Sequence, residues 1–371
     1  MFNQHGLIIG KFYPPHAGHD LLIATAARTC ERVTVIVMPA SHESISMSSR
    51  VSWLRQTHTD KKNVVITGIM DDLPIDHHSA AIWELHVALM QNALQNIGAP
   101  DVTAVFSSEA YGVELARRFN AIPVILDESR TLRPISSTAI RSDILGNWAS
   151  LAPATRAGLA LRVSVVGAES SGTTTLSRQL FKHFRSRGGS YDETAWVAEY
   201  GRQYSTEKWA TARAMASLRG HRQPCLEELV WTTPEFIQIA KMQNSMEDAA
   251  ARGGGPILIC DTDSFATSIW HERYVGSVSR DVVRLAEDSP KALTIVTDHE
   301  GVAFEQDGLR DGEHLRTWMT RRFARQLADA GRRYVIVSGS PEQRLAQAID
   351  AIDKAVSLHW QFPPPFMPRS S

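Results

Sequence analysis

The 371-residue sequence has little of three things that would narrow its class at once: cysteine, clustered basic charge and long apolar runs. Its three cysteines, Cys30, Cys225 and Cys260, are odd in number and far apart, which argues against a disulfide framework and against a paired-cysteine zinc site. No Lys/Arg block of the kind that follows a phosphate backbone is present, and the formal net charge is −1. Nucleic acid is therefore not an expected partner.

The sequence also lacks a signal peptide and any apolar run long enough to span a bilayer. We therefore expect a cytoplasmic protein with no membrane partner. Hydrophobic residues make up 43% of the chain and charged residues 21%, which is typical of a globular protein. A length of 371 residues favours two domains over one.

Short apolar segments alternate with helix-like segments along most of the chain, and a helix is expected at 81–98. Strands are predicted within 6–10, 32–40, 63–69, 102–109 and 122–127, and in a second series within 161–167, 195–204, 255–265, 292–301 and 332–340. Short buried strands that alternate with helices build parallel sheets covered on both faces. We therefore predict an α/β protein with two tandem domains of this kind.

The two series are separated by "GNWASLAPATRAGLA" (146–160), where Gly, Ala, Pro and Ser loosen the pattern before a new strand begins. We place the first domain at residues 1–150 and the second at 158–358. The remaining residues, 359–371, form a proline-rich tail that is expected to be extended or disordered.

The turn after the first predicted strand reads "GKFYPPHAGH" and contains His16 and His19. Residues three apart lie on one face of a helix, so both imidazoles can face one point. The helix N-terminus adds free N–H groups, and Gly18 would let a ligand come close to the backbone. A phosphate therefore fits this turn well. Zinc would need further ligands, and two ordinary histidines out of 14 remain the alternative.

The pattern G-K-F-x-P-x-H-x-G-H, followed by "ISSTAIR" at 135–141, resembles the two-part signature of the nucleotidyltransferase superfamily. The resemblance implies a Rossmann-like domain in which His16 and His19 stabilise the transition state of adenylyl transfer from ATP. It also assigns a group of motif residues to nucleotide binding: Gly10, Phe12, Gly18, Ser136, Ser137 and Thr138.

Adenylyl transfer to a phosphate needs no general base, because the attacking oxygen is already ionised. It needs charge neutralisation and in-line alignment. Lys11 would meet a phosphate oxygen, or else remain a solvated lysine, and Arg141 would hold the departing pyrophosphate. The hydroxyl residues at 136–138 would bind the same oxygens, cap the following helix, or both.

Three segments together resemble the sequences of the NadR-type bifunctional nicotinamide mononucleotide adenylyltransferase / ribosylnicotinamide kinase family. They are "GKFYPPHAGH", "VFSSE" (105–109) and "IW" (82–83). In that comparison Trp83 either stacks on the nicotinamide ring or packs its helix. Ser107 and Ser108, at the carboxyl end of a strand, would line the site. No DNA-binding helix-turn-helix precedes Gly6, so a repressor role is not expected.

The second domain opens on "GAESSGTTTL" (167–176), which has the G-x-x-x-x-G spacing of a Walker A phosphate-binding loop (P-loop) between a strand and a helix. Thr173 stands where the lysine belongs, and Thr174 stands where magnesium is bound. The predicted nucleotide-binding positions are Gly167, Ser170, Ser171, Gly172, Thr173, Thr174 and Thr175. A glycine-rich turn without a ligand is the alternative.

"AEYGRQY" (198–204), "DTDSFATSIW" (261–270) and "EQDGLRD" (305–311) resemble the P-loop kinase half of the same family, in the same order. A ribose 5′-hydroxyl is not ionised at pH 7, so a nearby carboxylate should help; Glu199 and Asp261 are the candidates. Asp261 or Asp263 could instead hold Mg²⁺. The resemblance also suggests substrate or phosphate contacts for four residues: Tyr200, Arg202, Asp263 and Arg310.

A Walker A lysine is worth roughly 3 kcal/mol, about a hundredfold in rate. Either another cation, Arg310 or Arg178, replaces it, or the domain binds nucleotide without turning over well. The sequence thus predicts an ATP- and Mg²⁺-dependent enzyme that phosphorylates nicotinamide riboside and converts the mononucleotide to NAD. The alternative is a monofunctional adenylyltransferase whose second domain is a sensor or structural module. The oligomeric state, a homo-oligomer included, stays open.

Overall fold

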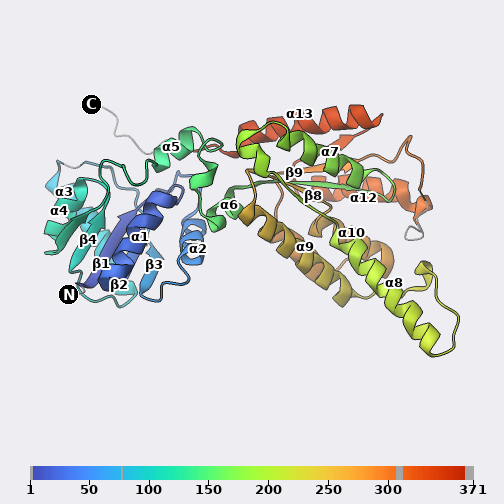
Figure 1. Ribbon diagram of the computed structural model, residues 1–371, viewed down its shortest axis with the longest axis horizontal. Helices are drawn as coiled ribbons and strands as arrows, with labels where there is room; N and C mark the ends of the chain where they lie inside the picture. Colours follow the sequence, from blue (N-terminus) through green and yellow to red (C-terminus); the bar gives the residue numbers. More distant parts are fainter. Residues whose placement is uncertain (1–2, 77, 306–311, 364–371) are drawn as a thin grey trace. The chain divides into compact units, whose positions relative to one another are not determined.

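The computed structural model describes residues 3–76, 78–305 and 312–363, and it divides the chain into two compact units (Figure 1). Unit 1 comprises Met1–Gly158 together with the C-terminal end of the chain from Trp360, and unit 2 comprises Leu159–His359. Each unit is an α/β domain with its own parallel five-stranded sheet.

Unit 1 has the strand order β3-β2-β1-β4-β5, with every neighbouring pair parallel. The strands are β1 (Asn3–Gly10), β2 (Cys30–Val37), β3 (Val64–Gly68), β4 (Ala104–Ser107) and β5 (Ile122–Ile125). The chain winds outward from β1 in one direction and then returns to β4 on its other side. The carboxyl end of β1 therefore lies at the switch point, where open α/β sheets bind ligands.

Helices cover both faces of this sheet (Figure 1). They are α1 (Ala17–Thr29), α2 (Met47–Thr57), α3 (Ala80–Asn96) and α4 (Tyr111–Arg118), followed by α5 (Ser137–Ser142), the 3₁₀ turn η1 (Trp148–Ser150) and α6 (Pro153–Leu159). Successive residues of β1 point to opposite sides. Ile8 packs with residues of α1 and α2, while Leu7 packs with residues of α3 and α4. Burial on both faces explains why the strands are almost purely apolar.

Unit 2 repeats this plan with the order β10-β9-β6-β8-β7, again entirely parallel. Its strands are β6 (Leu161–Gly167), β7 (Ala195–Val197), β8 (Ile257–Asp261), β9 (Leu293–Thr297) and β10 (Tyr334–Val337). The first strand is once more the central one, so the turn after β6 also lies at a switch point.

The helices of unit 2 are α7 (Thr173–Arg185), α8 (Tyr200–Leu218), α9 (Thr233–Gly253), α10 (Ser264–Val275), α11 (Arg280–Glu287), α12 (Arg316–Asp329) and α13 (Pro341–His359), with the 3₁₀ turns η2 (Gly189–Glu193), η3 (Leu226–Glu228) and η4 (Glu313–Leu315). Residues of α10, α11 and α12 pack together with Val166 and Val296 of the sheet in one core cluster. α8 projects away from the sheet (Figure 1), whereas α9 contacts β7 and β8.

Two expectations about local structure change. The predicted strand at 195–204 is only three residues long, because helix α8 begins at Tyr200. At the other end of the chain, Trp360 and Phe362 of the predicted tail pack within unit 1, where their rings lie 6.3 Å from Trp148 and 5.6 Å from Tyr13. These tail residues are therefore ordered by aromatic contacts.

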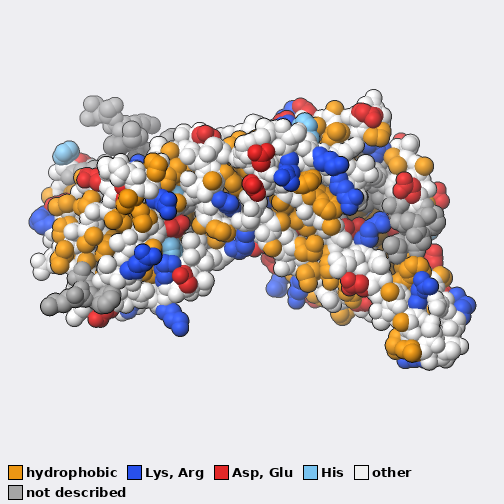
Figure 2. Space-filling view, viewed as in Figure 1, with side chains coloured by type: hydrophobic (Ala, Val, Ile, Leu, Met, Phe, Trp, Pro, Cys, Tyr) orange, Lys and Arg blue, Asp and Glu red, His pale blue; other side chains and the backbone are white. Residues whose placement is uncertain are grey.

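Surface charge is mixed on the face seen in Figure 2, where acidic and basic side chains are interspersed over both units. No helix in the described part of the chain is both long enough and apolar enough to cross a membrane.

Candidate functional site

The first candidate site is the turn between β1 and α1. His16 is the N-cap of α1, where its Nδ1 accepts a hydrogen bond from Gly18 N at 3.1 Å. The Nδ1 of His19 accepts from His16 N at 3.3 Å, and the two ring centroids are 3.8 Å apart. When Nδ1 accepts, a neutral imidazole carries its proton on Nε2. Both Nε2–H groups are therefore available as donors.

Burial keeps these imidazoles neutral. It lowers the pKa of His16 to about 4. Burial, helped by the neighbouring His16 and by Arg130, holds the pKa of His19 well below its usual value. Phe12 lies behind the pair, buried, with its ring centroid 4.7 Å from that of His19. Phe12 thus supports a histidine, and Gly18 has room for no side chain without crowding the His16 ring.

Three cations and one carboxylate surround Tyr13 beside this turn. Glu43 accepts from Lys11 Nζ at 2.8 Å and from Arg50 Nη1 at 2.6 Å. The guanidinium carbons of Arg50 and Arg141 lie 4.4 and 5.0 Å from the Tyr13 ring centroid. One carboxylate against three cations leaves a positive site suited to an anion.

The two separated motifs meet in space, although their hydrogen-bonded partners are 123 and 128 positions apart in the sequence. Arg141 Nη1 donates to Tyr13 O at 2.7 Å, and Ser137 Oγ donates to Pro14 O at 3.2 Å. Arg141 Nη2 also donates to Thr138 Oγ1 at 3.1 Å. Ser136 caps helix α5 by accepting from Ala139 N at 3.1 Å. Capping, one of the two predicted roles for these hydroxyls, is thus present.

The other predicted residues of unit 1 lie farther inside. Trp83 is buried in a core cluster with Leu7 and Val87, which is the packing role of the two that were predicted. Ser107 is buried at the end of β4 and exchanges hydrogen bonds with the backbone of Glu109. Ser108 follows it and is half-buried, while Gly10 ends β1 with the Phe12 ring close to its Cα.

Lys11 is already paired with Glu43, and Arg50 was not identified from the sequence. Arg50 is fully buried and donates to the backbone of Lys11 and Ile45 at 2.8 and 2.6 Å. A single arginine within "MSSRVSW" carries no local signal for this role, because its partners are set by the tertiary fold.

The second candidate site is the P-loop between β6 and α7. Gly172 adopts φ 88° at the N-cap of α7, a conformation that favours glycine. A Cβ on Gly167 would collide with the hydroxyls of Ser171 and Thr297. Ser171 Oγ donates to Ala168 O at 2.6 Å and pairs with Thr297 Oγ1 at 2.7 Å. The Ser171 hydroxyl therefore braces the loop from within.

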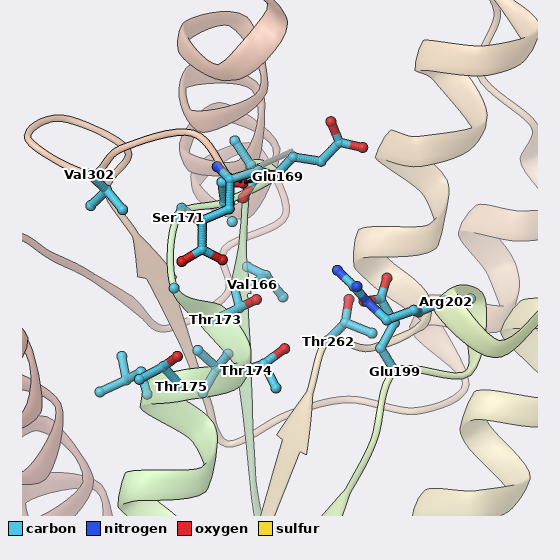
Figure 3. A pocket seen from close by; sticks show the side chains of 18 of the residues that line it. Val166, Glu169, Ser171, Thr173, Thr174, Thr175, Glu199, Arg202, Thr262 and Val302 are labelled. Atoms are coloured by element: carbon cyan, nitrogen blue, oxygen red, sulfur yellow. Dashed lines mark hydrogen bonds and ion pairs between the residues drawn. The ribbon is translucent and has the colours of Figure 1, made fainter. Parts of the chain in front are cut away.

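A cavity of about 650 Å³ opens over this loop. Its walls come from the P-loop and α7, the start of α8, an aromatic group on α9 and α10, and the segments after β9 and β10. The predicted residues in its lining are Gly167, Ser170, Ser171, Gly172, Thr173, Thr174, Thr175, Glu199 and Arg202. Figure 3 shows the side chains of Glu199 and Arg202 facing the loop from α8.

Asp261 lies at the base of the P-loop, at the end of β8, and is 3% exposed. Burial raises the pKa of its carboxyl; the hydroxyl of Thr174, which donates to it, and the charges of Arg202 and Arg178 act in the opposite direction. A hydroxyl and a carboxylate held together beneath a phosphate loop form an oxygen donor set that suits Mg²⁺. The described residues contain no cluster of three or more His, Cys, Asp or Glu ligands.

Glu199 precedes α8, and its carboxylate lies 3.9 Å from Arg202 Nε. The structure does not place Asp263 or Tyr200 in the cavity lining. Asp263 is fully buried and caps α10 by accepting from Ala266 N at 2.9 Å. One carboxylate oxygen of Asp263 thus has a local capping role, and its predicted role as a ligand stays a prediction. Tyr200 donates its backbone N–H to Gln243 Oε1 at 3.0 Å.

Arg178, one of the two predicted replacements for the missing lysine, does not line the cavity. The guanidinium of Arg178 lies 5.0 Å from the Trp196 ring, outside the cavity lining. Arg310 lies outside the described residues.

One wall of the cavity is aromatic and was not predicted. It contains Trp231, Phe236, Trp270 and Tyr274. The Trp270 and Tyr274 rings are nearly parallel, at 19°, with centroids 6.3 Å apart. Trp270 and Tyr274 are four residues apart, and this spacing in the sequence indicates that both rings lie on one face of a helix. Arg273 lies over both rings and pairs with Glu169 of the P-loop at 3.1 Å.

Each unit thus has a phosphate-binding turn at the switch point of a parallel sheet, which defines a two-domain α/β nucleotide-binding protein. A family model described as an AAA domain matches residues 162–344, which contain the P-loop. The chain is similar to NadR-type proteins over most of its length. Relatives in Salmonella typhimurium and Escherichia coli, both "Trifunctional NAD biosynthesis/regulator protein NadR", are 24% and 25% identical over 319 residues, 82% of this chain and 71% of each relative.

Two crystal structures share the fold of the whole chain. A NadR protein in complex with NR has a TM-score of 0.64 at 19% identity and covers 98% of both chains. A NadR protein in complex with NAD and AMP-PNP has a TM-score of 0.65 at 19% identity, covering 100% of this chain and 98% of the other.

Proposed function

We propose that unit 1 transfers AMP from ATP to nicotinamide mononucleotide, giving NAD and pyrophosphate. The observation that carries this proposal is the pair of neutral imidazoles whose Nε2–H groups are free of the hydrogen bonds that fix Nδ1. The family's NAD biosynthesis names and the bound NAD of one relative's structure agree with it.

In this reaction a 5′-phosphate oxygen of the mononucleotide attacks the α-phosphorus of ATP, and the bond from that phosphorus to pyrophosphate breaks. His16 and His19 would donate to the α-phosphate oxygens, where charge is redistributed in the transition state. Lys11, Arg50 and Arg141 would neutralise the departing pyrophosphate. No proton has to be removed from the nucleophile.

Unit 2 is proposed to phosphorylate nicotinamide riboside with ATP. The 5′-hydroxyl oxygen would attack the γ-phosphorus, its proton would pass to Glu199, and the bond to ADP would break. Glu199 is favoured over Asp261 as this base because it lines the cavity, whereas Asp261 lies beneath Thr174. The aromatic wall would receive a flat, positively charged ring.

Mg²⁺ is the metal that these residues fit, with Thr174 and Asp261 as its protein ligands and with phosphates and water supplying the rest. When bound, it would neutralise charge between the β- and γ-phosphates.

Two labels on ATP test the halves separately. Phosphorus label in the α-position should enter NAD when the chain is given nicotinamide mononucleotide, and label in the γ-position should enter the mononucleotide when it is given nicotinamide riboside. Transfer of α-label alone would leave the alternative, an adenylyltransferase with a nucleotide-sensing second unit, which the threonine at 173 favours. Transfer of neither label would contradict both.

A further inference from the structure

Two arginines that the sequence did not single out bind the backbone of the P-loop, and Arg344 also lines the cavity. Arg316 begins α12 and Arg344 lies in the first turns of α13; they are 7% and 6% exposed. Arg316 Nη2 donates to Ser170 O at 3.1 Å, and Arg344 Nη1 donates to Ser171 O at 3.0 Å. Each guanidinium thus binds a backbone carbonyl of the phosphate-binding loop.

The same two guanidiniums join the loop to the other segments that line the cavity. Arg316 also donates to His299 O at 3.2 Å and to Val302 O at 2.9 Å. Arg344 donates to Asp298 O at 2.8 Å, Glu300 O at 3.3 Å and Gly339 O at 2.8 Å. All the hydrogen-bond acceptors of this pair in the described chain are backbone carbonyls.

The charges of these two arginines have no direct carboxylate partner in the part of the chain that the structure describes. Within residues 3–76, 78–305 and 312–363, neither Arg316 nor Arg344 forms an ion pair with a carboxylate. Asp298 favours the charged form of Arg344, while burial and the nearby Arg316 oppose it and lower its pKa. Burying two neighbouring positive charges without carboxylate partners destabilises the fold unless an anion binds close to them.

The contacts also orient the loop. A trans peptide directs its C=O and the following N–H to opposite sides. Because Arg344 binds the carbonyl of Ser171, the N–H of Gly172 is directed away from that guanidinium, and Gly172 lines the cavity. The first N–H groups of α7 follow directly, without partners inside the helix.

We propose that Arg316 and Arg344 supply, at the P-loop backbone, the positive charge that a Walker A lysine supplies at position 173, and that the anion they serve is the polyphosphate of a nucleoside triphosphate. We class them as positioning residues, because each guanidinium holds a carbonyl of the loop. This inference rests on the proposed kinase function of unit 2.

The test compares ATP, ADP and AMP binding by calorimetry in the full chain carrying His16→Ala and His19→Ala, which restricts productive adenylyl transfer. Arg316→Gln and Arg344→Gln should each weaken ATP binding about tenfold, the effect of one unit charge across about 10 Å at a protein-like dielectric. The affinity for ADP should fall less than that for ATP, and the affinity for AMP should change less than about twofold. The reason is that the loss of affinity depends on the negative charge of the ligand's phosphates.

Arg332→Gln is the matched control, since Arg332 Nη2 donates to a backbone carbonyl, that of Ala286, in the same unit. It should leave all three affinities unchanged. The double variant Thr173→Lys, Arg344→Gln should regain most of the ATP affinity that Arg344→Gln loses. If Arg344 served folding alone, a lysine at position 173 would not restore that affinity.

The outcomes separate the two proposals. If the protein with intact arginines binds no nucleotide in unit 2, the proposed kinase function fails. If it binds ATP but the glutamine variants lose ATP and AMP affinity equally, or match Arg332→Gln, the inference about the guanidiniums fails while the function stands. If the glutamine variants do not fold, Arg316→Lys and Arg344→Lys decide: preserved preference for ATP over AMP supports the role of charge, and a lost preference contradicts it.

Discussion

The two phosphate-binding turns of this chain follow the central strands of two similar sheets, yet they present different chemistry. After β1, the groups that face a ligand are side chains: two neutral imidazoles and the cations around Tyr13. After β6, they are backbone N–H groups, and the nearest buried cations bind the loop carbonyls. A side-chain site should fail when one residue is changed, whereas a backbone site should tolerate changes on its surface.

The largest effect should come from the histidine pair. His19→Ala removes one of two donors to the α-phosphate, and we expect NAD formation from the mononucleotide to fall about a thousandfold. Phosphorylation of nicotinamide riboside should not change. The measurement is the initial rate of each half-reaction, with His78→Ala, an exposed histidine of the same unit, as control. Equal rates for His19→Ala and the control would remove the histidines from the mechanism.

The corresponding change in unit 2 is Asp261→Asn. Loss of the carboxylate beneath Thr174 should lower kinase kcat about a hundredfold and raise the Mg²⁺ concentration needed for half-maximal rate. Adenylyl transfer by unit 1 serves as the internal control. A kinase rate that falls without any change in Mg²⁺ dependence would argue that Asp261 is not a metal ligand.

Restoring the missing lysine should have a smaller effect than removing either of those groups. Because we attribute positive charge at the loop to Arg316 and Arg344, Thr173→Lys should raise kinase kcat/KM by no more than about tenfold, below the roughly hundredfold that such a contact can supply alone. Thr173→Ser is the control for a change of side chain without charge. A gain of a hundredfold or more would show that the native loop lacks this charge.

The smallest effect concerns pH. With the pKa of His16 lowered to about 4 and that of His19 also low, adenylyl transfer should vary less than about twofold between pH 6 and 8 from histidine titration. The free energy of unfolding does depend on pH. In the unfolded chain, His16 and His19 bind protons once the pH falls below their ordinary pKa of about 6.5, whereas in the folded chain they stay neutral. The histidine contribution to stability is therefore complete above pH 6.5 and is lost toward pH 4.

Thermal unfolding followed between pH 7 and pH 4.5 checks this sign. The chain should lose about 2 kcal/mol from His16 alone over that range and a further amount from His19, so His19→Gln should lose less. Equal losses in both proteins would indicate that His19 is protonated in the folded state as readily as in the unfolded state.

The sequence predicted what depends on local pattern. The strands of both sheets were located because buried parallel strands are short, apolar and bounded by turns. The pattern failed at 195–204, where Tyr200 and Tyr204 continue an apparent strand but are spaced i, i+4 on α8. The capping role of Asp263 at the start of α10 was not predicted, although an aspartate just before a helical segment is a common N-cap.

Residues whose roles depend on distant partners could not be predicted in this way. Arg344 and the Ser171 carbonyl that it binds are 173 residues apart in sequence, and Arg50 reaches the carbonyl of Lys11 across 39. A single arginine in a helix looks like ordinary surface charge. Only the tertiary fold shows that these guanidiniums are buried.

The most direct test of the central claim, that a P-loop without its lysine works as a kinase, uses the His16→Ala, His19→Ala variant. With unit 1 disabled, mononucleotide made by unit 2 cannot be consumed. The variant is incubated with nicotinamide riboside, ATP and Mg²⁺, and nicotinamide mononucleotide is measured by chromatography. We predict accumulation over many turnovers. No mononucleotide, while the wild-type chain still makes NAD from added mononucleotide, would contradict the claim and leave unit 2 as a nucleotide-binding module.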